Sequence, residues 1–393
     1  MHLRTGLLAF ALSLGAPALA SAQSLLGLDT GTGALPVPRI HEFQRDCTAL
    51  AICDSVSLSN PIADPAGGIA YGTCTGNVYT TDGFLLVATD LNCRGICRVV
   101  IPQIATSGWT GMAVDEDAGR MYFTDAVHVG YYDFRPCQFG NLGDFCRLPA
   151  GLNSPLTGVE IDPANGSLWV CDATGQVANL VLGGGQCRVR QIFRVLCPSQ
   201  TAPLSLRGIT LDPCARALFV TDDQGTVVTL DTAGNVQNCC RYARVQPARH
   251  LVGLARRPAP ARLFGQGCSG PGCAPCQPQI GVQGEPVIPS RCFGITLDQA
   301  PLGGTAVLML NIGGPCVQIP IGLCGPLEIG VPNFFSPGVA IGGGPGACGG
   351  QASFPLPIPS NSLLCGLQVC GQWIMLCPGG GLGLSDATSI VLN

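Results

Sequence analysis

The side chain best placed to do chemistry in this sequence is Glu160, an acid at a position where related segments carry small residues. It stands two residues after Gly158. The matching positions of four similar segments hold Ala70, Ala113, Thr210 and Ala255. A carboxylate that is removed from water needs an arginine, a histidine or a cation beside it. Glu160 is therefore a candidate for binding a ligand or a metal, and the alternative is a purely structural pair with a neighbouring arginine.

Three basic side chains hold comparable positions in the same segments. Arg207 and His250 stand just before repeated glycines, and His128 follows three residues after Asp125. Guanidinium groups bind anions, and a neutral imidazole binds metal ions. Glu160, His128, Arg207 and His250 form the candidate binding set, with a divalent metal as the cofactor to consider. No catalytic residue is identified from the sequence.

Two other motifs resemble metal sites. Cys268, Cys273 and Cys276 have the C-x4-C-x2-C spacing of an iron–sulfur ligand run. A fourth ligand at the expected distance is missing, so disulfides are the favoured interpretation. The acidic run 115–117 offers too few oxygens for calcium, which takes about six to eight. The run 165–167 fits a glycosylation acceptor, but Asn-Gly also favours a hairpin turn, and the turn is expected.

The elements that would position these residues come from a fifteen-residue repeat. Each copy begins with glycine, has an aromatic residue eleven places on, and in four copies ends with Asp. The glycines are Gly68, Gly111, Gly158, Gly208 and Gly253, and the aspartates are Asp82, Asp125, Asp172 and Asp222. The spacings of 43, 47, 50 and 45 residues are typical of propeller blades, each a small antiparallel sheet. We expect the repeated Asp to tie neighbouring blades together through backbone hydrogen bonds.

The repeat predicts an all-β fold with a β-propeller of five blades, six being the alternative. Residues 25–29 are expected to form the third strand of a blade that Gly253 to Gly267 completes with two strands, so that both chain ends close the ring. The residues just before the repeated glycines and just after the repeated Asp then line one mouth of a central channel, where Glu160, His128, Arg207 and His250 are placed.

Composition and cysteine content indicate an exported protein. Arg4, the apolar stretch 7–20 and a small-residue site near residue 22 predict a signal peptide over residues 1–22. All 23 cysteines follow it, so disulfides are the default. A cysteine pair follows the third strand of each blade, and Cys74 and Cys214 are expected to bond near the pairs of their own blades. The pairs are Cys47 and Cys53, Cys93 and Cys97, Cys137 and Cys146, Cys187 and Cys197, and Cys239 and Cys240. Cys171, where other blades have threonine, is the predicted free thiol. No transmembrane helix is expected, and a net charge of −4 gives no basis for nucleic-acid binding.

The blade pattern resembles secreted bacterial propellers of the NHL and gluconolactonase-like superfamily, as in GMAVDEDAGRMYFTD. The resemblance covers residues 24–267 and implies the architecture. For enzymes of that group it implies metal-dependent lactonases or lyases with acidic, Asn or His ligands at one mouth of the channel. The three residues before each repeated glycine include no acid, so the sequence departs from that ligand pattern.

The C-terminal part, residues 268–393, has a different composition. It holds five charged residues among many Gly and Pro, and about eight short apolar segments predict a disulfide-rich antiparallel β-sandwich. The segments FGQGCSGPGC and GQWIMLCP resemble a Gly-rich C-terminal domain of exported planctomycete-type proteins, which accompanies unrelated N-terminal modules. That recurrence implies a role in location or assembly. The predicted domains are therefore a signal peptide (1–22), a propeller (23–267) and a sandwich (268–393).

Three functions are consistent with these features. The first is an extracellular or cell-surface, non-enzymatic module of the cell envelope, in which the propeller binds a carbohydrate, peptide or protein and the sandwich serves attachment or assembly. The second is a metal-dependent propeller lactonase or lyase. The third is a purely structural envelope component. A bound divalent metal in the purified protein would favour the second, and self-assembly without a partner would favour the third.

Overall fold

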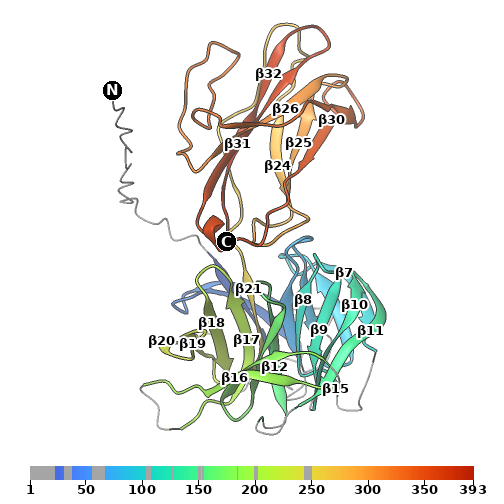
Figure 1. Ribbon diagram of the computed structural model, residues 1–393. Coiled ribbons are helices and arrows are strands. Elements are labelled where there is room, and N and C mark those ends of the chain that lie inside the picture. Colours follow the sequence, from blue (N-terminus) through green and yellow to red (C-terminus); the bar gives the residue numbers. More distant parts are fainter. Residues whose placement is uncertain are drawn as a thin grey trace, which may run out of the picture.

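A computed structural model, shown in Figure 1, describes residues 23–30, 38–54, 67–102, 108–125, 127–148, 152, 155–183, 185–198, 202–242 and 250–393. The predicted signal peptide lies outside these ranges. The described residues form β-strands and one short 3-10 helix, η1 (Ser362–Leu364), as the predicted all-β class requires. None of their helices is long and apolar enough to cross a membrane.

The N-terminal two thirds of the described chain folds into five antiparallel sheets, which we label A to E. Sheet A contains β21 (Leu251–Arg257), β1 (Ser24–Asp29), β2 (Arg39–Gln44) and β3 (Ala49–Asp54) in that order. Sheet B contains β4 (Gly68–Tyr71), β5 (Val78–Thr81), β6 (Leu85–Thr89) and β7 (Gly95–Val100). Sheet C contains β8 (Gly111–Asp115), β9 (Arg120–Thr124), β10 (His128–Arg135) and β11 (Gln138–Arg147), with β15 (Gly185–Gln186) added in parallel.

Sheets D and E repeat the same order of four strands. Sheet D contains β12 (Leu156–Asp162), β13 (Ser167–Asp172), β14 (Gln176–Val181) and β16 (Arg188–Arg194). Sheet E contains β17 (Leu206–Asp212), β18 (Ala217–Asp222), β19 (Thr226–Asp231) and β20 (Val236–Arg241). The first strand of each sheet is innermost: β4 contacts β8, β8 contacts β12, β12 contacts β17, β17 contacts β21, and β21 contacts β4. This is the predicted β-propeller.

The repeated glycines explain how closely the inner strands approach one another. A Cβ atom on Gly111 would lie 2.6 Å from the Cα atom of Gly158, and one on Gly208 would lie 2.7 Å from the carbonyl carbon of Gly253. A Cβ atom on Gly253 would in turn meet Gly68 at 3.1 Å. Because these neighbours are backbone atoms that cannot move aside, a side chain at these positions would push the sheets apart.

The repeated Asp forms backbone hydrogen bonds within its own sheet, a role that the sequence did not predict. The Oδ1 atom of Asp172 accepts hydrogen bonds from the backbone N–H groups of Thr174 (2.8 Å) and Gln176 (2.9 Å). Asp222 binds the N–H groups of Gln224 and Thr226 in the same way. Each carboxylate therefore stabilises the turn between the second and third strands of its own sheet, because a short Asp side chain reaches the N–H groups two and four residues ahead.

Sheet A corrects the predicted strand assignment at the chain ends. β1 pairs with β21 on one side and β2 on the other, so residues 24–29 form the second strand of the sheet and not the third. β2 and β3 follow as the third and fourth strands of the sheet. The second strand predicted for the last copy, around Phe264, instead forms β22 (Arg262–Phe264), which pairs with β32 (Leu382–Val391). The last repeat contributes one strand to sheet A.

Five disulfides join the outer parts of these sheets in succession. The two cysteines of each predicted pair lie on one sheet and bond to cysteines of the two neighbouring sheets. The bonds are Cys47–Cys240 (A to E), Cys53–Cys93 (A to B), Cys97–Cys137 (B to C), Cys146–Cys187 (C to D) and Cys197–Cys239 (D to E). Every sheet is thus bonded covalently to two others.

The C-terminal part folds into two sheets that share one core. Sheet F contains β22, β32, β31 (Gln368–Leu376), β26 (Thr305–Ile312) and β27 (Phe334–Phe335), with β23 (Cys268–Ser269) beside β32 and β28 (Val339–Ala340) beside β26. Sheet G contains β24 (Gln279–Gln283), β25 (Gly294–Ala300), β30 (Gly350–Pro355) and β29 (Gly342–Gly343). Ile295 and Leu297 of sheet G pack with Leu308, Trp373 and Ile390 of sheet F in the buried core between them.

Two disulfides fasten this C-terminal part to the propeller. Cys74, between β4 and β5, bonds to Cys292, and Cys214, between β17 and β18, bonds to Cys365. Both propeller cysteines were expected to bond within their own blades. They stand six residues after their glycines, on turns at the end of the propeller that faces the C-terminal part (Figure 1). The C-terminal part is therefore attached over one mouth of the propeller.

Candidate functional site

A cavity of about 780 Å³ lies between the propeller mouth and the C-terminal part. Its floor holds the residue two places after each repeated glycine, one from each sheet: Ala70, Ala113, Glu160, Thr210 and Ala255. Its roof comes from the loops 287–291 and 357–360 of the C-terminal part. Three of the five floor residues are alanine, and their small side chains leave space above the inner strands.

Glu160 is the one acid on this floor, as its place in the repeat predicted. Its Oε2 atom accepts a hydrogen bond from the Thr210 hydroxyl (2.7 Å), and its Oε1 atom accepts one from the backbone N–H of Ile161 (2.9 Å). Burial raises the pKa of Glu160 to about 7, although these hydrogen bonds and the charge of Arg256 favour the ionised form. The carboxyl group therefore changes charge near neutral pH.

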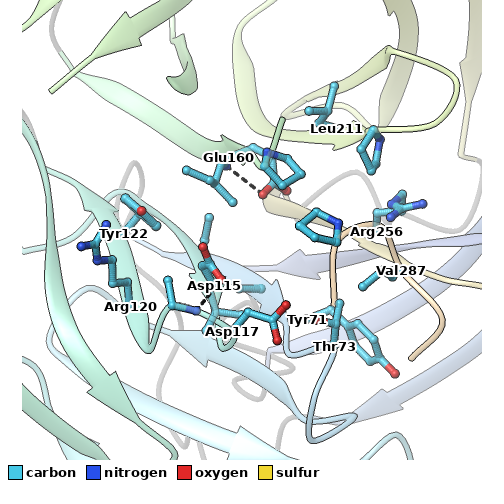
Figure 2. Close-up of a pocket in the computed structure, with 18 of the residues that line it drawn as sticks. Tyr71, Thr73, Asp115, Asp117, Arg120, Tyr122, Glu160, Leu211, Arg256 and Val287 are labelled. Atoms are coloured by element: carbon cyan, nitrogen blue, oxygen red, sulfur yellow. Dashed lines mark hydrogen bonds between the residues drawn. The ribbon is translucent and has the colours of Figure 1, made fainter. Parts of the chain in front are cut away.

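Arg256, on β21, lines the same cavity (Figure 2). Its side chain is 8% exposed, and its Nη1 atom lies 3.6 Å from Oδ1 of Asp212. Nη1 has no hydrogen-bond partner among the residues that the structure describes. Arg256 and Glu160 form no ion pair with each other, although the arginine contributes to the electrostatics of the acid. A guanidinium that lines a cavity and is only partly neutralised can bind an anionic acceptor on a ligand.

Asp212 lies beside Arg256 and is not among the residues that line the cavity. It also forms an ion pair with Arg45, which comes from the turn between β2 and β3. Burial alone would raise the pKa of Asp212, but the Arg256 and Arg45 guanidiniums outweigh it and hold the pKa below its usual value. The ionised Asp212 thus fixes the position of Arg256 while sharing its charge with a second arginine.

The acidic run 115–117 lies at the rim of the cavity, in the turn between β8 and β9. Each of its three side chains accepts hydrogen bonds from different residues. Asp115 accepts from the Ala118 N–H, Glu116 from the Tyr79 hydroxyl and the N–H groups of residues 74 and 75, and Asp117 from the Arg291 N–H. The oxygens do not converge on one point as a calcium site requires. Glu116 and Asp117 instead hold sheet C to sheet B and to the C-terminal part.

The other three predicted site residues lie at the opposite end of the inner strands. The Glu160–Thr210 bond and the close approach of Gly158 to Gly208 show that β12 and β17 run side by side in the same direction. Arg207 precedes its glycine, whereas Glu160 follows its own, so the two lie on opposite sides of the glycines. The predicted set therefore does not form one site.

At that opposite end, Arg207 and His250 gather around one acid. The Asp223 Oδ2 atom lies 3.9 Å from Arg207 Nη2 and 3.9 Å from His250 Nδ1. His128 belongs to a separate turn, where its Nδ1 atom lies 3.2 Å from Asp125 Oδ2. The contacts of His128 with Asp125, through its ring and its backbone N–H, stabilise the β9–β10 turn.

The cysteines supply no metal site where the sequence suggested one. Cys268, Cys273 and Cys276 bond to Cys324, Cys377 and Cys348, so they cannot serve together as iron–sulfur ligands. In the described ranges, one group of three ligand-type side chains lies close together, namely Cys74, Asp117 and Cys292, and its two cysteines are joined by a disulfide. Asn165 and Gly166 form the turn between β12 and β13, as predicted.

Cys171 lies on β13, buried and outside any disulfide. The remaining cysteines, Cys316 and Cys370 among them, form eleven disulfides in total. Burial raises the pKa of the Cys171 thiol to about 12, so it is neutral at physiological pH.

Sequence reasoning missed Arg256 and the roof of the cavity. Arg256 stands three residues after Gly253, where the other copies have Tyr71, Val114, Ile161 and Leu211. A single charged residue at a position that is uncharged in the other four copies is a signal that the sequence alone contains. The roof loops had no such signal, because their position depends on disulfides between distant parts of the chain.

A scan against protein-family models and a search of curated proteins found no match. Among solved structures, the chain is similar to a structure from a nidogen/laminin complex at 14% identity, covering 60% of this chain and 98% of that one, with a TM-score of 0.35. It is similar to the WD40 repeats of RRP9 at 9% identity (56% and 84% covered, TM-score 0.36) and to glutaminyl cyclase of Myxococcus xanthus at 16% identity (48% and 68% covered, TM-score 0.32). At these scores we draw no functional argument from them.

Proposed function

We propose that this protein is an exported, non-enzymatic binding module that holds a ligand in the cavity between its propeller and its C-terminal part. One observation carries the proposal: Glu160 and Arg256 both line a cavity of about 780 Å³ without pairing with each other. This volume falls within the range of about 300–1,000 Å³ that is usual for small-molecule sites. Its lining combines apolar and small side chains with charged and hydroxyl groups that can orient a ligand.

The proposal includes a propeller of five blades closed by both chain ends. Three observations support it. The inner strands contact one another in a circle from β4 to β21, the five glycines approach one another in the same circle, and the five disulfides link sheets A to E in the same order. The pairing of β1 with β21 would then close the ring without a free strand edge.

The proposed domain division is a signal peptide over 1–22, a propeller from residue 23, and a C-terminal sandwich ending at residue 393. The pairing of β22 with β32 favours a junction at 258–261, a few residues before the predicted one at 267. Eleven disulfides are compatible with an extracellular protein. We propose that the propeller is of the NHL type and that the C-terminal domain, of the planctomycete type, attaches the protein to the cell envelope as well as covering the cavity.

A cavity-blocking variant tests the proposed function. Ala118 is exposed, lines the cavity rim and donates its backbone N–H to Asp115. Ala164 is its matched control, because it is exposed, donates its N–H to Asp162 in the equivalent turn of sheet D, and does not line the cavity. A panel of saccharides, small acids, amines and peptides is screened against the wild type by ligand-observed NMR.

We expect at least one compound to bind the wild type and Ala164→Trp but to bind Ala118→Trp at least about tenfold more weakly, because the indole fills the cavity entrance. Equal binding to both variants would place the ligand outside the cavity and contradict the proposal. So would the absence of any binder across the panel.

A further inference from the structure

The Arg256 guanidinium is the feature of the cavity that says most about its ligand. Its Nη1 atom is buried 3.6 Å from Asp212 Oδ1 with no hydrogen-bond partner among the described residues, and the arginine itself lines the cavity. Asp212 divides its charge between Arg256 and Arg45. A buried guanidinium that is only partly neutralised is costly until an anionic acceptor completes its hydrogen bonds.

The other polar groups beside Arg256 are hydroxyl and carboxyl side chains. Glu160 and Thr210 form the adjoining part of the floor, and Tyr71 and Tyr122 line the walls. Vicinal hydroxyl groups of a sugar can donate to and accept from such side chains. The propeller mouth is covered by the roof loops 287–291 and 357–360, so the cavity accepts a short ligand and not a long chain in its middle.

We propose that the cavity binds an acidic saccharide, whose carboxylate pairs with Arg256 and whose neighbouring hydroxyl groups hydrogen-bond with Glu160 and Thr210. This inference rests on the proposed function, because it assigns a ligand class to the same cavity. It adds that the ligand must carry a negative charge, which a general binding cavity does not require.

The charge of Glu160 then regulates affinity. When Glu160 is ionised it repels the ligand carboxylate, and when it is protonated it can donate a hydrogen bond. Other charged or titratable groups face this region from the packed elements: Tyr71 on β4, Asp115 on β8, Arg120 and Tyr122 on β9, Asp212 on β17, Arg256 on β21, Arg45 behind Asp212, and Asp117 and Arg291 at the rim. Burial raises the pKa of Glu160 to about 7, so its ionisation falls between pH 6 and pH 8.

Calorimetric titration with digalacturonate and with its neutral dimethyl ester tests the inference on the full chain. We expect the acid to bind the wild type at least tenfold more tightly than the ester, and about tenfold more tightly at pH 6 than at pH 8. Glu160→Gln should remove this pH dependence. Arg256→Gln should weaken acid binding about 10- to 100-fold and leave the ester unchanged, because the lost hydrogen bonds involve charged groups.

Two controls keep the test decisive. Arg262 is an exposed arginine outside the cavity, so Arg262→Gln should bind like the wild type. If Arg256→Gln does not fold, Arg256→Lys keeps the charge and should give intermediate binding, since lysine lacks the forked donors of arginine.

Equal affinity for acid and ester, or no binding of either, would overturn the acidic ligand. If triglycine bound as tightly as digalacturonate in an Arg256-dependent manner, the carboxylate would come from a peptide and the saccharide would be rejected. If the acidic saccharide fails but another compound binds the wild type and not Ala118→Trp, the proposed function stands. If the compounds that bind do so equally well in Ala118→Trp, both the proposed function and the acidic ligand are rejected.

Discussion

At the scale of single residues, the cavity is defined by two charges that replace small or uncharged residues in the repeat. Glu160 takes a place where three of the other sheets have alanine, and Arg256 takes one where the others have tyrosine or aliphatic residues. The sequence singled out Glu160 because the repeat makes its neighbours comparable. The sequence placed His128, Arg207 and His250 wrongly beside Glu160. Residues before a repeated glycine lie toward one end of the inner strand, and residues after it lie toward the other end.

The raised pKa of Glu160 predicts a pH-dependent stability. The pKa is about 7 in the folded protein and about 4.3 in an unfolded chain. The folded state therefore binds the proton more tightly, so the wild type loses stability as the pH rises from about 4 through about 7. Glu160→Gln, which cannot ionise, should therefore become more stable relative to the wild type between pH 5 and pH 8, by about 1–3 kcal/mol or a few degrees in melting temperature.

Scanning calorimetry of both proteins at the two pH values measures this difference. Groups other than Glu160 titrate alike in the two proteins and cancel. A melting-temperature difference that stays constant between pH 5 and pH 8 would show that Glu160 is not held in a desolvated site.

The thiol of Cys171 is expected to be inert in the folded protein. Because burial raises its pKa to about 12 and removes it from solvent, iodoacetamide should not modify it at pH 8 under native conditions. In denaturant without reductant, mass spectrometry should find one alkylated cysteine per chain, at position 171. Alkylation of the native protein, or of a different cysteine, would contradict the assignment.

At the scale of the elements, the glycines set the distance between sheets. Gly208→Ala would place a Cβ atom 2.5 Å from the backbone nitrogen of Leu254, and we expect it to destabilise the protein by about 3 kcal/mol. Gly342 is the control, because a Cβ atom there meets nothing within 4 Å and its φ is not positive. Thermal melting should show a large loss for Gly208→Ala and almost none for Gly342→Ala. Similar melting temperatures for the two variants would contradict this role.

The repeat allowed the inner strands and the propeller to be predicted, since a glycine, an apolar residue and an aromatic residue at fixed spacing repeat the same local requirements. It did not allow the strand order of sheet A to be predicted. Asp29 ends β1, the second strand of its sheet, as Asp172 and Asp222 end the second strands of sheets D and E. Asp29 accepts a hydrogen bond from the N–H of Arg39 across a much longer connection. Because of that longer connection, the sequence does not show that Asp29 is equivalent to the repeated Asp.

At the scale of the whole molecule, disulfides decide how the parts are joined. Sequence spacing grouped the propeller cysteines correctly but not their partners, because each bond crosses between sheets that lie side by side only after folding. The same reason hid Cys74 and Cys214, whose partners lie 218 and 151 residues away. These two bonds come from sheets B and E, on either side of sheet A, and they fix the C-terminal part over the cavity.

Both parts of the chain build the cavity, because two disulfides bond the C-terminal part over the propeller mouth. Peptide mapping of the unreduced protein by mass spectrometry tests this arrangement. We predict that the peptides containing Cys74 and Cys292 are linked to each other, and likewise those containing Cys214 and Cys365. Linkage of Cys74 or Cys214 to another cysteine of the propeller would leave the mouth without its roof and contradict the account.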